Sequence, residues 1–234
     1  MKLLVENIAF STAVLILLIN LIGYVYSYLI VSSKIGNAKQ IQPNYKISFD
    51  YFKKHTPLFF FNVLTLIVFV YIGLYFENIR IYVIDVDSEF STISIIIHLF
   101  IILVFDDTFF YFLHRLMHEN KYIYTKVHKI HHRANSPIPM DYIYVHPLEW
   151  MSGFIGPFIG ILLLGGVSIY TFWLYLFVRN LHELSIHSGL KTSFIYKILP
   201  FYGTNEHHDV HHSKRDGNYS STFTFWDNVF KTKF

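Results

Sequence analysis

The stretch FSTISIIIHLFIILVFDDTFFYFLHRLMH, residues 90–118, joins a long apolar run directly to a pair of histidines. Residues 90–105 carry no charged side chain, and the apolar character continues to about Leu113. Because a helix needs about 20 mostly apolar residues to cross the bilayer core, this stretch predicts a membrane helix. His114 and His118 are four residues apart, which places both imidazoles on one face at the end of that helix.

Three other long runs also lack charged residues, namely 7–33, 56–76 and 150–178. Such runs are typical of membrane helices, so we expect an all-α integral membrane protein. The composition agrees, because 15% of the residues are charged against about 25% in soluble domains. The first run is too long for a cleaved signal peptide. The net charge of +3, without a basic stripe, argues against nucleic acid as a partner.

The run at 150–178 is divided by Gly165 and Gly166. Its two halves, extended to residues 147–164 and 167–187, each cross most of a bilayer at about 1.5 Å per residue. We therefore expect a helical hairpin, which brings the total to about four to five transmembrane helices.

This hairpin has His146 at its entrance and His187 at its exit, so both are expected on the same side of the membrane. Gly156 and Gly160 form a pair of small residues one helical turn apart. Such a pair favours close packing against another helix.

Loop charges predict the orientation of the bundle, because positive residues concentrate on the cytoplasmic side. The loop after the first run is rich in lysine, the next loop has one cation, and the region after residue 114 is again basic. These cations are Lys34, Lys39, Lys46, Lys53 and Lys54; then Arg80; then Arg115, Lys121, Lys126, Lys129 and Arg133. The N-terminus is thus expected outside and the histidines in the cytoplasm. The abundance of Lys, Ile and Asn suggests an AT-rich, bacterial genome. We therefore expect the membrane to be a bacterial inner membrane.

Histidine is abundant, at 14 of 234 residues, and nine of the 14 lie within 114–132 and 207–212. Two further clusters have the spacing i, i+3, i+4 of one helix face. They are His128, His131 and His132, and His208, His211 and His212. Neutral imidazole binds iron, zinc and copper. A single metal needs about three or four protein ligands, so eight clustered histidines predict two metals with room for dioxygen.

The remaining histidines are weaker candidates. We favour His187 as a ligand, and for His182 a ligand and a structural role are equally weighted. His207 precedes a histidine that already completes the helical spacing, so we expect it to support a ligand. His146 stands before a proline at a helix start, which favours capping or support over ligation. Two isolated histidines are expected to be structural, namely His55 and His98.

Carboxylates near the clusters are candidate supports. Asp106 and Asp107 lie at membrane depth, where charge is costly and usually functional. Asp107 is seven residues before His114 and shares its helix face, so it is a candidate to accept a ligand's free ring N–H. Asp209 is a similar candidate within the last cluster. The alternative is that these carboxylates only mark a helix end at the membrane interface.

Two absences restrict the redox chemistry. The chain has no cysteine, which excludes iron–sulfur clusters and thiolate-bound haem within it. Gly153, Gly156 and Gly160 lack the spacing of a dinucleotide-binding loop. We therefore expect a separate electron-transfer protein.

The histidine motifs resemble those of the fatty acid hydroxylase and sterol desaturase superfamily. These motifs are His114-Arg-Leu-Met-His118, His128-Lys-Ile-His-His132 and His208-Asp-Val-His-His212. Others look like its methylsterol monooxygenase branch: Asp106-Asp-Thr, Tyr111-Phe-Leu-His-Arg115, His146-Pro-Leu-Glu149, His187-Ser-Gly189, Gly217-Asn-Tyr and Trp226-Asp227. The resemblance covers about residues 100–234. We accordingly expect N-terminal transmembrane helices over 1–96 and a catalytic domain over 97–234.

The resemblance implies a non-haem diiron centre in a cytoplasmic helical cap, with dioxygen as co-substrate and electrons from a small carrier protein. By this likeness the metal ligands are His114, His118, His128, His131, His132, His187, His208, His211 and His212. Zinc is expected to substitute for iron in purified samples, because imidazole binds it more tightly. The activity expected is hydroxylation or desaturation of a lipid, whether sterol-like, isoprenoid or fatty acyl. Glu206 stands where the branch often has a basic residue, which leaves the lipid open.

Two alternatives belong to other functional classes. A histidine-rich metal transporter would place its histidines at mid-depth along a pathway, whereas here nearly all lie at or beyond helix ends. An inactive lipid-binding scaffold of the same fold is the second alternative. The complete set of histidine motifs argues against it.

Overall fold

The computed structural model describes residues 2–32, 39–44, 48–75, 84–85 and 91–234. The described chain is mostly helical, with one short two-stranded sheet. Its elements are α1 (Lys2–Ser32), α3 (Phe49–Tyr75), β1 (Ile84–Asp85), α5 (Thr92–Glu119), α6 (Lys121–Lys126), η1 (His128–Arg133), η2 (Pro139–Tyr142), α7 (Pro147–Gly153), α8 (Ile155–Leu163), β2 (Val167–Ser168), α9 (Ile169–Ile186), α10 (Phe194–Lys197), α11 (Asn205–Lys214) and α12 (Phe225–Val229).

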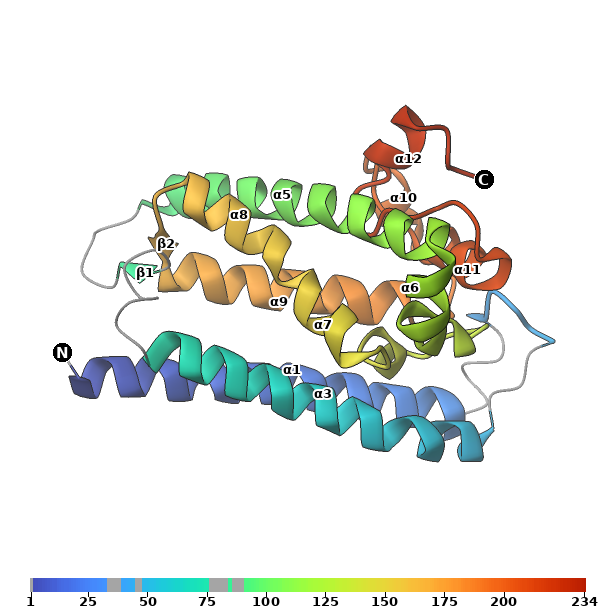
Figure 1. Cartoon of the computed structure of the whole chain (residues 1–234), viewed down its shortest axis with the longest axis horizontal. Helices are drawn as coiled ribbons and strands as arrows, with labels where there is room; N and C mark the ends of the chain where they lie inside the picture. Colours follow the sequence, from blue (N-terminus) through green and yellow to red (C-terminus); the bar gives the residue numbers. More distant parts are fainter. Residues whose placement is uncertain (1, 33–38, 45–47, 76–83, 86–90) are drawn as a thin grey trace.

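The long helices run side by side along the longest axis of the molecule (Figure 1). Helix α1 packs on α3, while α5 packs on α8 and α9. Three helices, α1, α3 and α5, are long and apolar enough to cross a membrane. Many of their large apolar side chains are exposed, which suits contact with lipid better than contact with water. The structure thus agrees with the prediction of an all-α membrane protein.

The expected hairpin is present as α7 and α8 followed by α9. The turn lies at Gly165 and Gly166, whose φ angles of 70° and 104° are in the region that glycine adopts most readily. The outward half bends at Phe154, between α7 and α8. β2 follows the turn and pairs in parallel with β1. Helix α9 then runs back to the end of the bundle at which α7 begins (Figure 1).

The glycine pair predicted to favour close packing does lie at a close helix contact. A Cβ atom on Gly156 would lie 2.9 Å from the Cα atom of Asp106, and one on Gly160 would lie 3.1 Å from the Cα atom of Ile102. A side chain at position 156 would push α8 away from the backbone of α5, and one at position 160 would make a tight contact there. This contact fixes the hairpin against the helix that carries the first two histidines.

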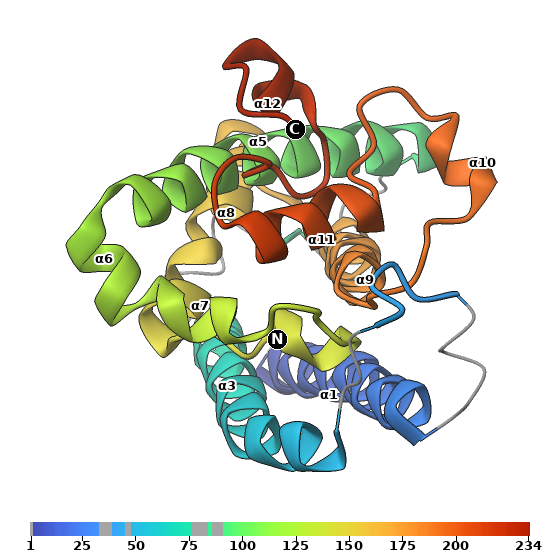
Figure 2. The same cartoon turned by 90° about the vertical axis from the view of Figure 1, so that its right-hand side faces the viewer.

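The short helices α6, α10, α11 and α12 gather at the end of the bundle where α5 and α9 finish, with α11 in their midst (Figure 2), whereas β1 and β2 lie at the other end (Figure 1). The second histidine cluster lies on a helix, as its spacing predicts, and this helix, His128–Arg133, is a 3-10 helix. A segment of the first loop reaches this end, where the Ile41 N–H donates to the Gly189 carbonyl. The loop cations Lys34, Lys46 and Arg80 lie outside the described residues.

The N-terminal helix pair is joined to this end by buried polar contacts. The Nδ1 atom of His55 lies 2.7 Å from a carboxylate oxygen of Asp141 in η2. Asn62 on α3 donates its side-chain amide to the carbonyls of Ile143 and Val145. His55 thus has the structural role expected of it, since it holds α3 against the loop that follows the second histidine cluster.

Candidate metal centre

Nine buried or half-buried imidazoles converge at this end, and their ligand nitrogens form two groups. Within each group the nitrogens all lie within 4.8 Å of one another. The five-histidine group is His114, His118, His128, His132 and His211, and the four-histidine group is His131, His187, His208 and His212. Among the described residues, these are the same nine histidines that the resemblance implied as ligands.

The two groups are interleaved through shared motifs. In η1, His128 and His132 belong to the five-histidine group while His131 belongs to the other. In α11 the assignment is reversed: His208 and His212 belong to the four-histidine group, while His211 belongs to the five-histidine group. The i, i+4 pair of each motif thus shares a group, and the i+3 histidine serves the neighbouring one. This arrangement holds the two groups next to each other.

The spacing of ring nitrogens in the five-histidine group fits coordination of one ion. The Nε2 atom of His128 lies 2.9 Å from that of His118, 3.0 Å from that of His132 and 3.1 Å from that of His114. With metal–nitrogen bonds of about 2.1 Å, ligands at right angles are about 3.0 Å apart, while tetrahedral ligands are about 3.4 Å apart. These ring nitrogens are therefore close enough together to bind a single ion.

The four-histidine group shows a comparable convergence. The Nε2 atom of His208 lies 2.9 Å from that of His187 and 3.1 Å from that of His212. The Nε2 atoms of His131 and His187 are 3.5 Å apart. This wider spacing leaves the group more open on the side of His131.

Backbone carbonyls fix which ring nitrogen carries the proton. The acceptors are the carbonyls of Tyr219 for His114, Gly217 for His211, Ala134 for His212 and Glu183 for His187, at 2.7–2.9 Å from Nδ1. A carbonyl oxygen can only accept, so each Nδ1 atom must donate its proton. In a neutral ring the Nε2 atom then presents a lone pair toward its group.

The histidines beyond the membrane helices are held in the neutral form. Burial, reinforced by the neighbouring imidazoles, lowers the pKa of His128, His208 and His212 well below the usual range. The same causes lower the pKa of His131 to about 3. Where both Nε2 atoms of a facing pair carry a lone pair they repel each other, whereas a cation between them binds both. The donor set therefore fits transition-metal ions.

Two carboxylates that sequence reasoning missed, the buried Glu149 and the half-buried Glu183, lie beside histidines of different groups. Glu149 Oε1 lies within hydrogen-bond distance of His128 Nδ1, at 2.8 Å. Glu183 Oε2 lies 3.5 Å from His187 Nδ1. The Oε1 atom of the same carboxylate pairs with Arg179, which also pairs with Asp106. Each is a carboxylate beside or within a predicted membrane helix, and that position was an available signal.

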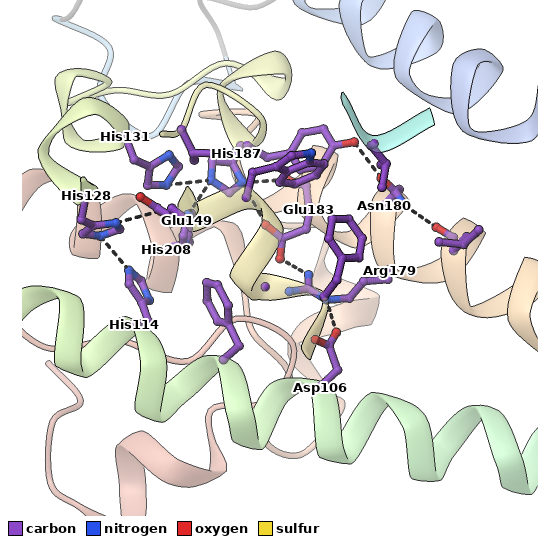
Figure 3. Close-up of a pocket in the computed structure, with 18 of the residues that line it drawn as sticks. Asp106, His114, His128, His131, Glu149, Arg179, Asn180, Glu183, His187 and His208 are labelled. Carbon is purple, nitrogen blue, oxygen red and sulfur yellow. Dashed lines mark hydrogen bonds and ion pairs between the residues drawn. The ribbon is translucent and has the colours of Figure 1, made fainter. Parts of the chain in front are cut away.

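A cavity of about 110 Å³ opens onto both groups (Figure 3). Five of the nine histidines line one part of it, namely His114, His128, His131, His187 and His208. Apolar side chains line much of the remainder, including Leu66, Phe110, Val145, Trp150, Phe154 and Leu176. The paired charges of Asp106, Arg179 and Glu183 lie deeper along the helices. The cavity thus brings an apolar molecule next to both groups.

The other candidate histidines lie outside both groups. The ring nitrogens of His182 contact the Tyr202 hydroxyl at 3.2 Å and the Ser221 carbonyl at 3.1 Å. His146 caps α7, where its Nδ1 atom accepts the Leu148 N–H. His207 Nε2 lies 3.1 Å from a carboxylate oxygen of Asp227.

The expectation that Asp107 supports a ligand imidazole directly is corrected by its contacts. Its Oδ1 atom accepts the backbone N–H groups of Thr222 and Phe223 at 2.7 and 3.1 Å. Seven residues along a helix separate Asp107 from His114 by about 10 Å, so the nearer backbone is the available donor. Asp209 likewise accepts from the Gln42 side chain at 2.9 Å, and its partner is not a ring nitrogen.

Comparisons with known proteins agree with this site. A sequence profile of the fatty acid hydroxylase family matches residues 99–232, which include all nine histidines. Methylsterol monooxygenase 1 of Rattus norvegicus is 42% identical over 130 residues, which cover 55% of this chain and 44% of that protein. Methylsterol monooxygenase erg25B of Aspergillus fumigatus is 36% identical over 139 residues, 57% of this chain and 47% of its own length. Methylsterol monooxygenase 1-3 of Arabidopsis thaliana is 35% identical over 146 residues, 61% of this chain and 50% of its own length.

These matches therefore span half or less of the curated relatives. No solved structure gives a significant match.

Proposed function

Since the chain belongs to the fatty acid hydroxylase family, we propose that it is a membrane-bound non-haem diiron oxygenase that hydroxylates or desaturates a lipid. The observation that carries this proposal is the convergence of nine imidazoles, in groups of five and four, beside a largely apolar cavity that histidines of both groups line. The names of the similar proteins support an oxygenase that acts on a sterol-like lipid.

Each group would hold one iron ion, and the bound ions would supply the redox chemistry that reduces dioxygen and oxidises a C–H bond. Hydroxylation consumes dioxygen, two electrons and two protons and yields an alcohol and water. The chain has no cysteine, so we propose that the electrons come from a separate electron-transfer protein. Zinc would occupy the same imidazoles in iron-poor preparations.

The chain's own residues orient the ligands and exclude water. The carbonyls of Tyr219, Gly217, Ala134 and Glu183 hold four rings with Nε2 turned inward. The apolar part of the cavity removes water from around the reacting carbon. At about 110 Å³ the cavity is smaller than one of about 150 Å³ that binds benzene. It therefore admits the reacting end of a sterol-like, isoprenoid or fatty acyl lipid and leaves the rest in the bilayer.

We further propose that the hairpin crosses the membrane, which gives four to five spans, and that the metal centre faces the cytoplasm with the N-terminus outside. The division into residues 1–96 and 97–234 remains a proposal. The relatives named above are eukaryotic, so they give no support to the expectation of a bacterial inner membrane.

The test is a lipid analysis of cells that express either the wild-type chain or His131→Ala under ¹⁸O₂. A lipid that gains one ¹⁸O atom, or loses two hydrogens, only with the wild type would support the oxygenase. Identical lipid profiles would favour the inactive scaffold. Histidine-dependent uptake of metal into vesicles, with no change in lipid, would favour the transporter.

A further inference from the structure

The motif Trp226–Asp227 lies outside the nine-histidine centre, yet Asp227 is fully buried. Its Oδ1 atom accepts the Tyr219 N–H at 2.9 Å and the Thr232 hydroxyl at 2.6 Å. Its Oδ2 atom accepts the Ser220 N–H at 2.9 Å and lies 3.1 Å from His207. One carboxylate thus collects four polar groups from three parts of the chain.

Two of these groups belong to a loop, residues 217–220, that touches the metal centre from its other side. The Tyr219 carbonyl accepts the Nδ1–H of His114 at 2.7 Å, and the Gly217 carbonyl accepts that of His211 at 2.8 Å. The Asp227 carboxylate therefore binds backbone N–H groups of the loop 217–220, and carbonyls of the same loop orient the imidazoles of His114 and His211. Movement of this loop would turn both rings.

The loop has a conformation that needs such an anchor. Gly217 and Asn218 have φ angles of 76° and 52°, and the second is an uncommon conformation for a residue with a side chain. A Cβ atom on Gly217 would lie 2.4 Å from the Thr232 carbonyl oxygen. The Asn218 N–H also donates to that oxygen at 2.7 Å. The C-terminal residues and Asp227 together enclose the loop.

The four-histidine group has different supports. The Nδ1 atom of His212 donates to the Ala134 carbonyl, and that of His187 donates to the Glu183 carbonyl. Both carbonyls lie outside residues 217–234. In the part of the chain that the structure describes, the carbonyls of residues 217–220 accept ring N–H groups from the five-histidine group alone.

We propose that Asp227 is a positioning residue for one metal of the pair, because it fixes the loop that orients His114 and His211. This inference rests on the proposed dinuclear centre. Burial raises the pKa of Asp227, but hydrogen bonds from His207, Thr232 and the Ser220 N–H outweigh it and bring that pKa to about 2. The carboxylate is therefore ionised and accepts through both oxygens at neutral pH.

The test is a Co²⁺ titration of the full-length chain in detergent, read by bound equivalents and by cobalt absorption. In Asp227→Asn the amide offers one acceptor oxygen and points an NH₂ group at a backbone N–H. We expect one of two sites to weaken by about 10–100-fold, as for other outer supports of metal ligands. The second site should keep its wild-type affinity.

Asp216→Asn is the matched control. Asp216 is an exposed carboxylate beside the same loop that accepts the Tyr219 hydroxyl at 2.9 Å. Asp216 is exposed and acts on His118 only through its charge, so its replacement should weaken the five-histidine site by less than about 5-fold and leave the other site unchanged. In a His131→Ala chain, where only the five-histidine site remains intact, adding Asp227→Asn should weaken the single remaining strong site.

Thermal unfolding of the metal-free variants distinguishes misfolding from positioning. The milder Thr232→Val change removes one donor to Asp227 and should weaken the same site less. If folded Asp227→Asn weakens metal binding equally at both sites, or at neither site, the role of Asp227 would be overturned while the dinuclear centre would stand. A wild-type chain that binds fewer than two ions would overturn the dinuclear centre and the assignment with it.

Discussion

The two histidine groups share their motifs but differ in their supports. The five-histidine group draws ligands from α5, η1 and α11, and its rings are oriented by a C-terminal loop and Glu149. The four-histidine group draws on η1, α9 and α11, and its rings are oriented by Ala134 and Glu183. Shared motifs keep the groups adjacent, while separate supports make each group sensitive to different substitutions.

The largest expected effect comes from removing a ligand. His208→Ala leaves three imidazoles in the four-histidine group, whereas His211→Ala leaves four in the other. We expect His208→Ala to lose one bound metal and all oxygenase activity, since its loss should exceed the roughly 10–100-fold effect of an outer support. His211→Ala should retain two metals, one of them weakened. Metal equivalents per chain check this, and the reverse order would contradict the difference between the groups.

The carboxylates Glu149 and Glu183 should give the next largest effect. Glu149 Oε1 lies within hydrogen-bond distance of His128 Nδ1, while His187 Nδ1 has the Glu183 backbone carbonyl at 2.9 Å besides a more distant carboxylate. Glu149→Gln should therefore weaken the five-histidine site by about 10-fold. Glu183→Gln should change the other site by less than about 3-fold, although it leaves Arg179 with one carboxylate fewer. Site-resolved Co²⁺ affinities check this, and equal effects would remove the distinction.

Acidification should act on both groups alike. Burial lowers the pKa of His131 in one group, to about 3, and of His211 in the other. Below the unfolded value of about 6.5 the unfolded chain binds more protons, so stability is lost as the pH falls from there toward the folded pKa. Each such imidazole contributes up to about 1.4 kcal/mol per pH unit in the metal-free chain. Unfolding midpoints that stay constant between pH 7.5 and 5.5 would contradict the neutral, buried assignment.

The smallest effect is expected at Asp209. Its described hydrogen bond is to Gln42, and an amide oxygen can still accept it. Asp209→Asn should keep both metals and shift the free energy of unfolding by less than about 1 kcal/mol. Loss of either metal in this variant would show that Asp209 supports the centre after all.

The convergence of eight of the nine histidines could be predicted because their three clusters have the spacing of one helix face. His114 and His118 lie one helical turn apart, and the later clusters repeat that spacing with an added histidine at i+3. The hairpin was predictable for a similar reason, since Gly165 and Gly166 divide an apolar run that is too long for one crossing.

The division of ligands between groups was not predictable from spacing. His131 and His211 cross to the neighbouring group because η1 and α11 face each other, and that is a tertiary relation. Several of the groups that orient the histidines were not predictable from the sequence either, because they lie far from those histidines along the chain. The Tyr219 carbonyl lies 105 residues from His114, and Asp107 reaches the backbone at Thr222 because the C-terminal segment folds against α5.

The most direct test of the dinuclear centre is iron content per chain after expression in iron-supplemented cells, with wild type measured beside His131→Ala. We predict about two irons in the wild type and about one in the variant, since His131 belongs to the four-histidine group alone. One iron or none in the wild type, or a content that His131→Ala leaves unchanged, would contradict the account.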